Sequence, residues 1–117
     1  MDYVADVKKY TANVDEAAVA AMEATYRLVL SQDDSKLVAY SDGDELERVK
    51  TNFLKGKLGL TDADDLDGAI AAVGEKMAGV SHKSRLTVYY LLAEHVGKLD
   101  ALKEPFGHLA SRPVGAS

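Results

Sequence analysis

Cysteine and tryptophan are absent from this 117-residue sequence, and proline occurs only twice, both times after position 104. Without cysteine the chain can form neither a disulfide nor a thiolate metal site. Because proline lacks a backbone N–H and clashes inside helices, its absence before that position leaves helices uninterrupted. The fold must therefore be stabilised by an apolar core, and a chain of this length can bury one.

Basic residues are outnumbered as well, with 14 Lys and Arg against 19 Asp and Glu, a formal net charge of −5. Nucleic acids and anionic membranes attract basic surfaces, so this balance argues against both. The opening MDYVADVKKY lacks the apolar run of a signal peptide, and no apolar run is long enough to cross a membrane. We expect a cytoplasmic protein that binds neither nucleic acid nor membranes.

The clearest pattern is a helix over residues 84–99, SRLTVYYLLAEHVGKL. On a helical wheel Thr87, Glu94 and Lys98 share one narrow strip, and large apolar residues fill most of the remaining circumference. A surface helix buries one stripe, whereas a helix that is apolar on most sides must be surrounded. The pattern predicts an all-α fold, a compact bundle of about five helices packed around this central helix.

One-sided apolar patterns predict the surrounding helices over about residues 2–12, 13–31, 41–59 and 61–79. The last of these has a stripe of Leu66, Ile70, Val73 and Met77. We predict a single helical domain over residues 1–104 and a C-terminal tail over 105–117, whose small, polar end we expect to be disordered.

Residues 32–43 are ambiguous. Leu37, Val38 and Tyr40 lie between two polar stretches, and so short an apolar run does not distinguish a strand from one helical turn. Because a lone strand would have no partner in an otherwise helical chain, we predict a helical turn.

Two stretches, VKTNFLKGKLGL at 49–60 and RLTVYYLLAEHVGKL at 85–99, resemble a family of small bacterial proteins known as DUF2853, a domain of unknown function. The opening DYVADVKKY is also similar, so the resemblance covers residues 2 to about 100. The sequence departs from the family at Gly43, where a proline is expected at the first helical position. The resemblance implies a compact all-helical domain with no assigned activity, and it carries over no catalytic residues.

No motif predicts a catalytic residue, a cofactor site or a metal site. His82, His95 and His108 are too far apart in sequence to form a ligand pair on one helix. The acidic run over residues 62–68 lacks the glutamate that closes a calcium-binding loop. Such a run is typical of a solvated helix N-terminus, where carboxylates interact well with the helix dipole.

The candidate contact face combines a basic segment with one tyrosine: Lys50, Lys55, Lys57, Arg85 and Tyr90. In an acidic protein the simpler interpretation of the lysines is salt bridging to acidic neighbours on a solvated face. A buried tyrosine needs a partner for its hydroxyl, so Tyr90 either bonds a neighbouring helix or emerges at a polar rim.

Two functions are compatible with these patterns. The first is contact with an unknown protein partner or with a second copy as a homodimer, if the first helix leaves Tyr3, Tyr10 and part of the central helix exposed. The second is binding of a small anionic ligand on the candidate contact face. A flat apolar patch favours the first function, and a concave pocket that joins a tyrosine hydroxyl to a basic rim favours the second.

Overall fold

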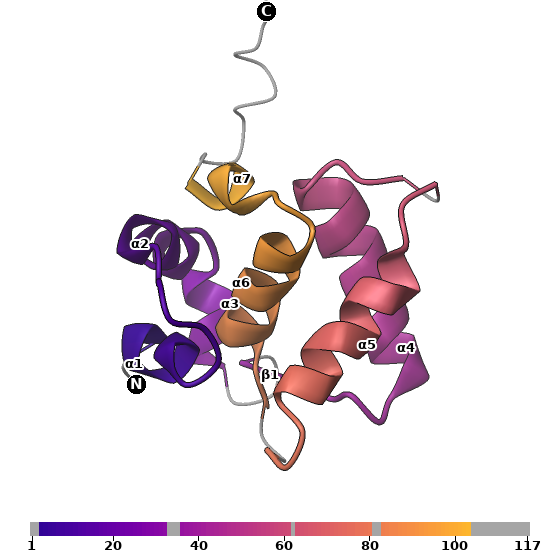
Figure 1. Cartoon of the computed structure of the whole chain (residues 1–117), viewed down its shortest axis with the longest axis horizontal. Helices are drawn as coiled ribbons and strands as arrows, with labels where there is room; N and C mark the ends of the chain where they lie inside the picture. Colours follow the sequence, from indigo (N-terminus) through magenta and orange to yellow (C-terminus); the bar gives the residue numbers. More distant parts are fainter. Residues whose placement is uncertain (1–2, 33–35, 62, 81–82, 104–117) are drawn as a thin grey trace, which may run out of the picture.

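The predicted central helix is α6 (Arg85–His95), which lies in the middle of the computed structural model (Figure 1). The structure describes residues 3–32, 36–61, 63–80 and 83–103. Every residue from Leu86 to Ala93 is buried, so α6 is enclosed on all sides. The central position of this helix and the all-α class are confirmed.

The surrounding elements are more numerous than predicted. In chain order they are α1 (Tyr3–Lys8), α2 (Glu16–Thr25), α3 (Arg27–Ser31), β1 (Leu37–Val38), α4 (Gly43–Arg48), the π-helix η1 (Val49–Lys57), α5 (Leu66–Lys76), β2 (Lys83–Ser84) and, after α6, α7 (Leu99–Lys103). In Figure 1, α1 and α2 lie on one side of α6, α4 and α5 on the other, and α7 crosses its end.

Two predicted boundaries differ from the structure. The second helix is divided at Tyr26, whose backbone (φ −106°, ψ 24°) leaves the helical region between α2 and α3. The central helix ends at His95, because Gly97 adopts φ 74° and turns the chain into α7. Leu102 of α7 is buried, and the predicted C-terminal tail over 105–117 lies outside the described residues.

Two residues of the polar strip, Thr87 and Glu94, contact the N-terminal segment, whereas Lys98 lies beyond the end of α6 and is exposed. Thr87 is fully buried, and its hydroxyl donates to a carboxylate oxygen of Asp6 in α1. Glu94 accepts a hydrogen bond of 2.8 Å from the Thr11 hydroxyl, just after α1. Tyr3 and Tyr10 pack against the core. The surface on which we predicted self-association is therefore closed by α1.

Helix η1 has a wider turn than an α-helix, with hydrogen bonds to residues five positions back, as in the 2.9 Å bond from the Leu58 N–H to the Phe53 carbonyl. Val49 and Leu58 are nine residues apart, which in an α-helix is about two and a half turns and would place them on opposite faces. Both are buried, together with Phe53 and Leu54. The π-helix brings all four side chains onto one face.

Our prediction of a helical turn within residues 32–43 is wrong. Leu37 and Val38 form a strand that pairs antiparallel with Ser84 and Lys83. The partner strand is two residues long and directly precedes α6, so no periodicity in the sequence could reveal it. The pair continues into α6 through a 2.8 Å hydrogen bond from the Arg85 N–H to the Lys36 carbonyl, and this fixes the start of the central helix.

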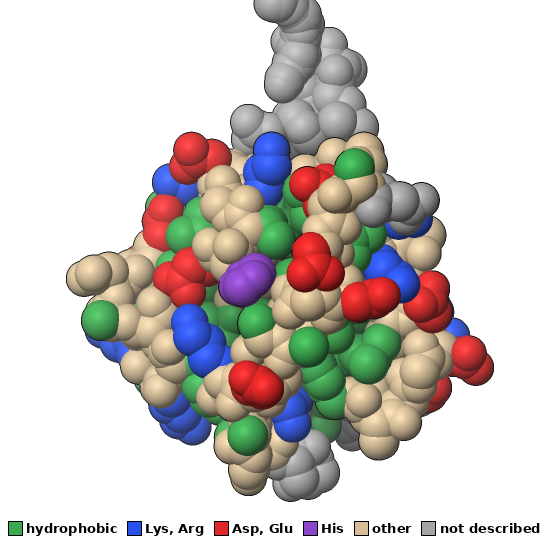
Figure 2. Space-filling view, turned by 45° about the vertical axis from the view of Figure 1, so that its right-hand side comes forward, with side chains coloured by type: hydrophobic (Ala, Val, Ile, Leu, Met, Phe, Trp, Pro, Cys, Tyr) green, Lys and Arg blue, Asp and Glu red, His purple; other side chains and the backbone are tan. Residues whose placement is uncertain are grey.

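Acidic, basic and small apolar groups are interspersed on the face shown in Figure 2, without a large region of one charge sign. Among the residues that the structure describes, no helix is long and apolar enough to cross a membrane.

Replacing Leu92 by alanine tests the central position of α6. Leu92 is completely buried, so Leu92→Ala should lower the free energy of unfolding by roughly 2–5 kcal/mol. The same substitution at Leu28, which is 76% exposed, should change it by less than about 0.5 kcal/mol. Urea denaturation of both variants measures the difference. A loss below about 1 kcal/mol at Leu92 would contradict the central role of α6.

A pair of glycine substitutions tests the packing of α5 against the loop before α4. A Cβ at Gly74 would lie 2.9 Å from Cε2 of Tyr40, whose hydroxyl donates to the Ile70 carbonyl at 3.0 Å. A Cβ at Gly43 would meet nothing within 4 Å. In Gly74→Ala, crowding against the Tyr40 ring should lower the free energy of unfolding by about 1–3 kcal/mol. This loss exceeds the gain of about 1 kcal/mol that alanine brings through its higher helix propensity.

We therefore expect Gly74→Ala to lower the thermal midpoint and Gly43→Ala to leave it unchanged or raise it. Equal midpoints for the two variants would show that the Tyr40 ring moves aside without cost.

Candidate functional site

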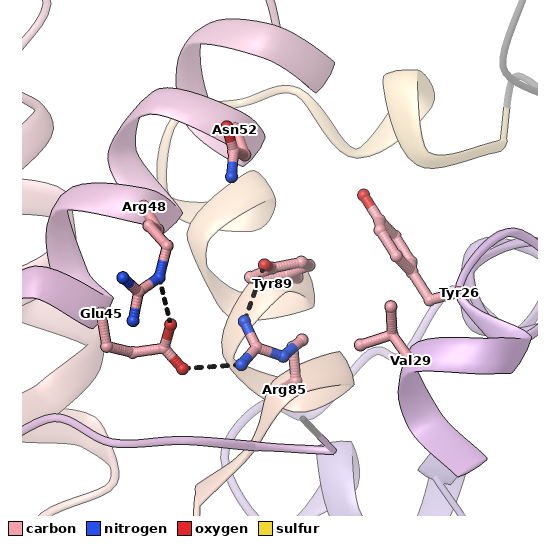
Figure 3. Close-up of a pocket in the computed structure, with 7 residues that line it drawn as sticks. All are labelled: Tyr26, Val29, Glu45, Arg48, Asn52, Arg85 and Tyr89. Carbon is pink, nitrogen blue, oxygen red and sulfur yellow. Dashed lines mark hydrogen bonds and ion pairs between the residues drawn. The ribbon is translucent and has the colours of Figure 1, made fainter. Parts of the chain in front are cut away.

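A pocket of about 270 Å³ opens between α3 and η1, beside the first turns of α6 (Figure 3). We call it the α3–η1 pocket. Its lining residues come from four helices and from the junction of α2 and α3: Tyr26, Val29, Glu45, Arg48, Asn52, Arg85 and Tyr89. The pocket combines tyrosine rings with two arginines. A concave, partly basic site of this kind favours binding of a small anion over contact with a protein through a flat surface.

Arg85 is held in the pocket by three segments of the chain. Its guanidinium forms a 2.7 Å ion pair with Glu45 of α4 and donates to the Tyr89 hydroxyl at 3.0 Å and to the Leu37 carbonyl of β1 at 3.1 Å. Burial opposes its charge, but the hydrogen bonds to Tyr89 and Glu45 outweigh this effect and raise the pKa of Arg85. The side chain therefore remains a fixed cation.

Arg48 supplies a second, more exposed cation. It lies one turn after Glu45 on α4, and its Nε is 3.7 Å from the other oxygen of the same carboxylate. Its side chain is 62% exposed, against 11% for Arg85. Glu45 is thus shared by two arginines (Figure 3), which leaves the pocket with a positive balance in an acidic protein.

Aromatic rings form the wall of the pocket. Tyr89 stacks on Phe53 of η1 with ring centres 4.0 Å apart. The Tyr26 ring packs edge-on against the Tyr89 ring, with centres 5.4 Å apart. Burial, with a smaller effect of Tyr89, raises the pKa of Tyr26 above its usual range. The Tyr26 hydroxyl therefore stays protonated at neutral pH and can donate a hydrogen bond.

Of the predicted contact face, only Arg85 lines the pocket. Lys50 is engaged by Glu47 at 2.9 Å and by Asp67 at 3.0 Å, and these hydrogen bonds raise its pKa to about 12. This is the salt bridging expected of a solvated face. Lys55 and Lys57 lie on η1, partly buried, and are not among the lining residues.

Tyr90 points away from the pocket. It is completely buried, and its hydroxyl accepts a 2.8 Å hydrogen bond from the Asp15 N–H at the start of α2. Its role is to satisfy a backbone group inside the fold. The tyrosine beside Arg85 is instead Tyr89, one position earlier in the sequence.

The candidate contact face did not include five of the residues that line the pocket: Tyr26, Glu45, Arg48, Asn52 and Tyr89. One local signal was available, because residues four apart lie on the same side of a helix, as Arg85 and Tyr89 do. The proximity of Glu45 and Arg85, forty positions apart in the sequence, depends on the β1–β2 pairing that the sequence did not reveal.

The described ranges contain no group of three or more His, Asp or Glu side chains placed to hold a metal ion. Three acidic residues at the start of α5 bond the backbone or a neighbouring lysine. Asp64 accepts a hydrogen bond from the Thr61 N–H, Asp65 caps α5 at Gly68, and Asp67 pairs with Lys50.

The model of a protein family described as proteins of unknown function, DUF2853, matches residues 2–100. The chain belongs to the DUF2853 family. No curated protein matches the sequence. The resemblance inferred from the sequence is confirmed, and the α3–η1 pocket lies entirely within the DUF2853 region. Membership brings no assigned activity, so the function of this DUF2853 protein must be argued from the pocket.

Two glutamates of α4 provide a matched test of the Arg85 junction. Glu45→Gln leaves a largely buried guanidinium without its carboxylate, and we expect the free energy of unfolding to fall by about 1–3 kcal/mol, less than for a fully buried pair because water reaches the site. Glu47→Gln removes a pair in which the carboxylate is 67% exposed, and should cost about 0–1 kcal/mol. Chemical denaturation of both variants compares them. Equal losses would show that the Arg85 junction is no more important than a surface pair.

Proposed function

We propose that this protein binds a small organic anion in the α3–η1 pocket. The observation that carries the proposal is the pair of arginines, Arg85 and Arg48, at one side of a concave site with tyrosine walls. Guanidinium groups match carboxylates and phosphates in charge and geometry. An apolar wall with a few convergent polar groups is the usual composition of a small-molecule site.

The volume of the pocket restricts the size of the ligand. About 270 Å³ lies just below the range of about 300–1,000 Å³ typical of pockets for drug-sized ligands. A single ring that carries an acidic group is small enough for this space. The class that we propose is therefore a small aromatic or similarly flat acid.

Protein contact, the first function considered from the sequence, has less support. The arc of α6 that self-association would require to be exposed is buried, and Leu28 is the one exposed large apolar side chain in the described ranges. A second hollow lies beside Leu28, lined only by Ala24, Thr25, Arg27, Leu28 and Val29. Single exposed leucines are common in monomers, so Leu28 does not indicate a protein interface. A protein partner or a homodimer, a cytoplasmic location and the absence of nucleic-acid binding remain predictions from the sequence.

Titration with benzoate and with benzamide, its neutral analogue, tests the proposal. We expect benzoate to shift the NMR amide signals of pocket residues such as Arg48, Asn52 and Tyr89, and benzamide to bind at least about tenfold more weakly, since a charge-assisted hydrogen bond contributes about 1.5–3 kcal/mol. Arg48→Gln should weaken benzoate binding severalfold. Lys98→Gln, which removes an exposed cation outside the pocket, should leave it unchanged.

Equal shifts with benzoate and benzamide, or equal losses in the two variants, would overturn the proposal. The first result would mean that the pocket does not recognise the charge, and the second that only the overall charge of the protein matters.

A further inference from the structure

We propose that the ligand is a flat acid with a hydrogen-bonding group at the end opposite its carboxylate, and that this carboxylate replaces Glu45 on Arg85. This inference rests on the proposed function and names the class of ligand. It follows from two features of the α3–η1 pocket: the arginine end already holds a carboxylate, and the other end holds polar groups.

At the arginine end, Glu45 occupies the position that a ligand carboxylate would take. One of its oxygens lies 2.7 Å from the Arg85 guanidinium, and the other lies 3.7 Å from Nε of Arg48. Two carboxylates cannot share this space without strong repulsion, so an entering acid must displace Glu45. Glu45 belongs to the first turn of α4, a helix near the surface, and can turn out towards water.

Arg85 keeps its place when Glu45 leaves. Its guanidinium still donates to the Leu37 carbonyl at 3.1 Å and to the Tyr89 hydroxyl at 3.0 Å. Both acceptors belong to segments that the β1–β2 pairing and the core hold in position. The cation is therefore preorganised, and the exchange of one carboxylate for another requires no movement of α6.

At the other end, two polar groups face the pocket. Figure 3 shows the Asn52 amide and the Tyr26 hydroxyl on the side away from Glu45 and the two arginines. Within the described part of the chain, neither side chain makes a polar contact with another residue. An amide both donates and accepts hydrogen bonds, and the protonated Tyr26 hydroxyl donates one. A hydroxyl group on the ligand can pair with either of them.

Between the two ends the lining is apolar. Val29 of α3 and the ring of Tyr89 border the space between the polar groups and Arg85 (Figure 3). A flat ring can lie there without leaving a polar atom unpaired. The proposed ligand therefore has a carboxylate, a ring and a hydroxyl in line, as in 4-hydroxybenzoate, which serves as the probe.

Calorimetric or NMR titrations of the full chain with benzoate and 4-hydroxybenzoate test the polar end. We expect 4-hydroxybenzoate to bind about threefold to tenfold more tightly, the effect of one additional hydrogen bond of about 0.5–1.5 kcal/mol. Asn52→Ala should remove most of this difference. Asn13→Ala, at an exposed position outside the pocket, should preserve the difference.

Glu45→Gln tests the exchange of carboxylates. If the ligand replaces Glu45, removing the charge of Glu45 should tighten the binding of both acids severalfold, although the domain itself becomes less stable. If Glu45 only orients Arg85, the same variant should weaken binding, and this result would overturn the exchange. Far-UV circular dichroism confirms that the variant is folded.

The outcomes separate this inference from the proposed function. Binding of neither acid would overturn both. Equal binding of the two acids by the wild-type protein would overturn the two-ended ligand and leave anion binding intact. A preference for 4-hydroxybenzoate that survives in Asn52→Ala would show that Asn52 does not read the hydroxyl.

Discussion

The enclosure of α6 is the constraint on which the rest of the structure depends. A helix that is buried on every side has no solvent to satisfy its polar groups, so each must find a partner on a neighbouring element. Thr87 bonds Asp6, and the Tyr90 hydroxyl receives the Asp15 N–H. These bonds also hold α1 and the start of α2 against α6.

The pocket exists because this enclosure ends at the first residue of α6. Arg85 follows directly after β2, where the cover changes from helices to a two-residue strand pair. A charge cannot be buried there without a partner, and Glu45 provides one. The site is thus the boundary of the core, where an ionised group is held firmly and water still has access. Such boundaries are favourable places for recognition, since a fixed cation attracts an anion without being reorganised.

The sequence was informative wherever a regular period determined the outcome. The burial of α6 and the stripe of α5 followed from the α-helical period, and both are observed. The sequence was uninformative where contacts join distant segments. Leu37 finds its partner at Ser84, and two residues have no period to detect.

The assignment of Tyr90 to the candidate contact face failed for a similar reason. A turn of about 100° separates adjacent residues of a helix, so Tyr89 faces Arg85 and Tyr90 faces α2. A helical wheel gives these directions but does not show which neighbour stands at each of them. Only the arrangement of the surrounding helices decides which tyrosine borders the pocket.

The π-helix has an evolutionary consequence. Helix η1 contains more residues per turn than an α-helix between the same two ends, so a relative that lost one residue between positions 49 and 57 could close the gap by returning to α geometry. The flanking elements would stay in place while the residues of this segment rotated about the helix axis. Asn52 would then leave the pocket lining and another side chain would take its position. Within the family, selectivity could therefore diverge through a single deletion that leaves the elements on either side of η1 in place.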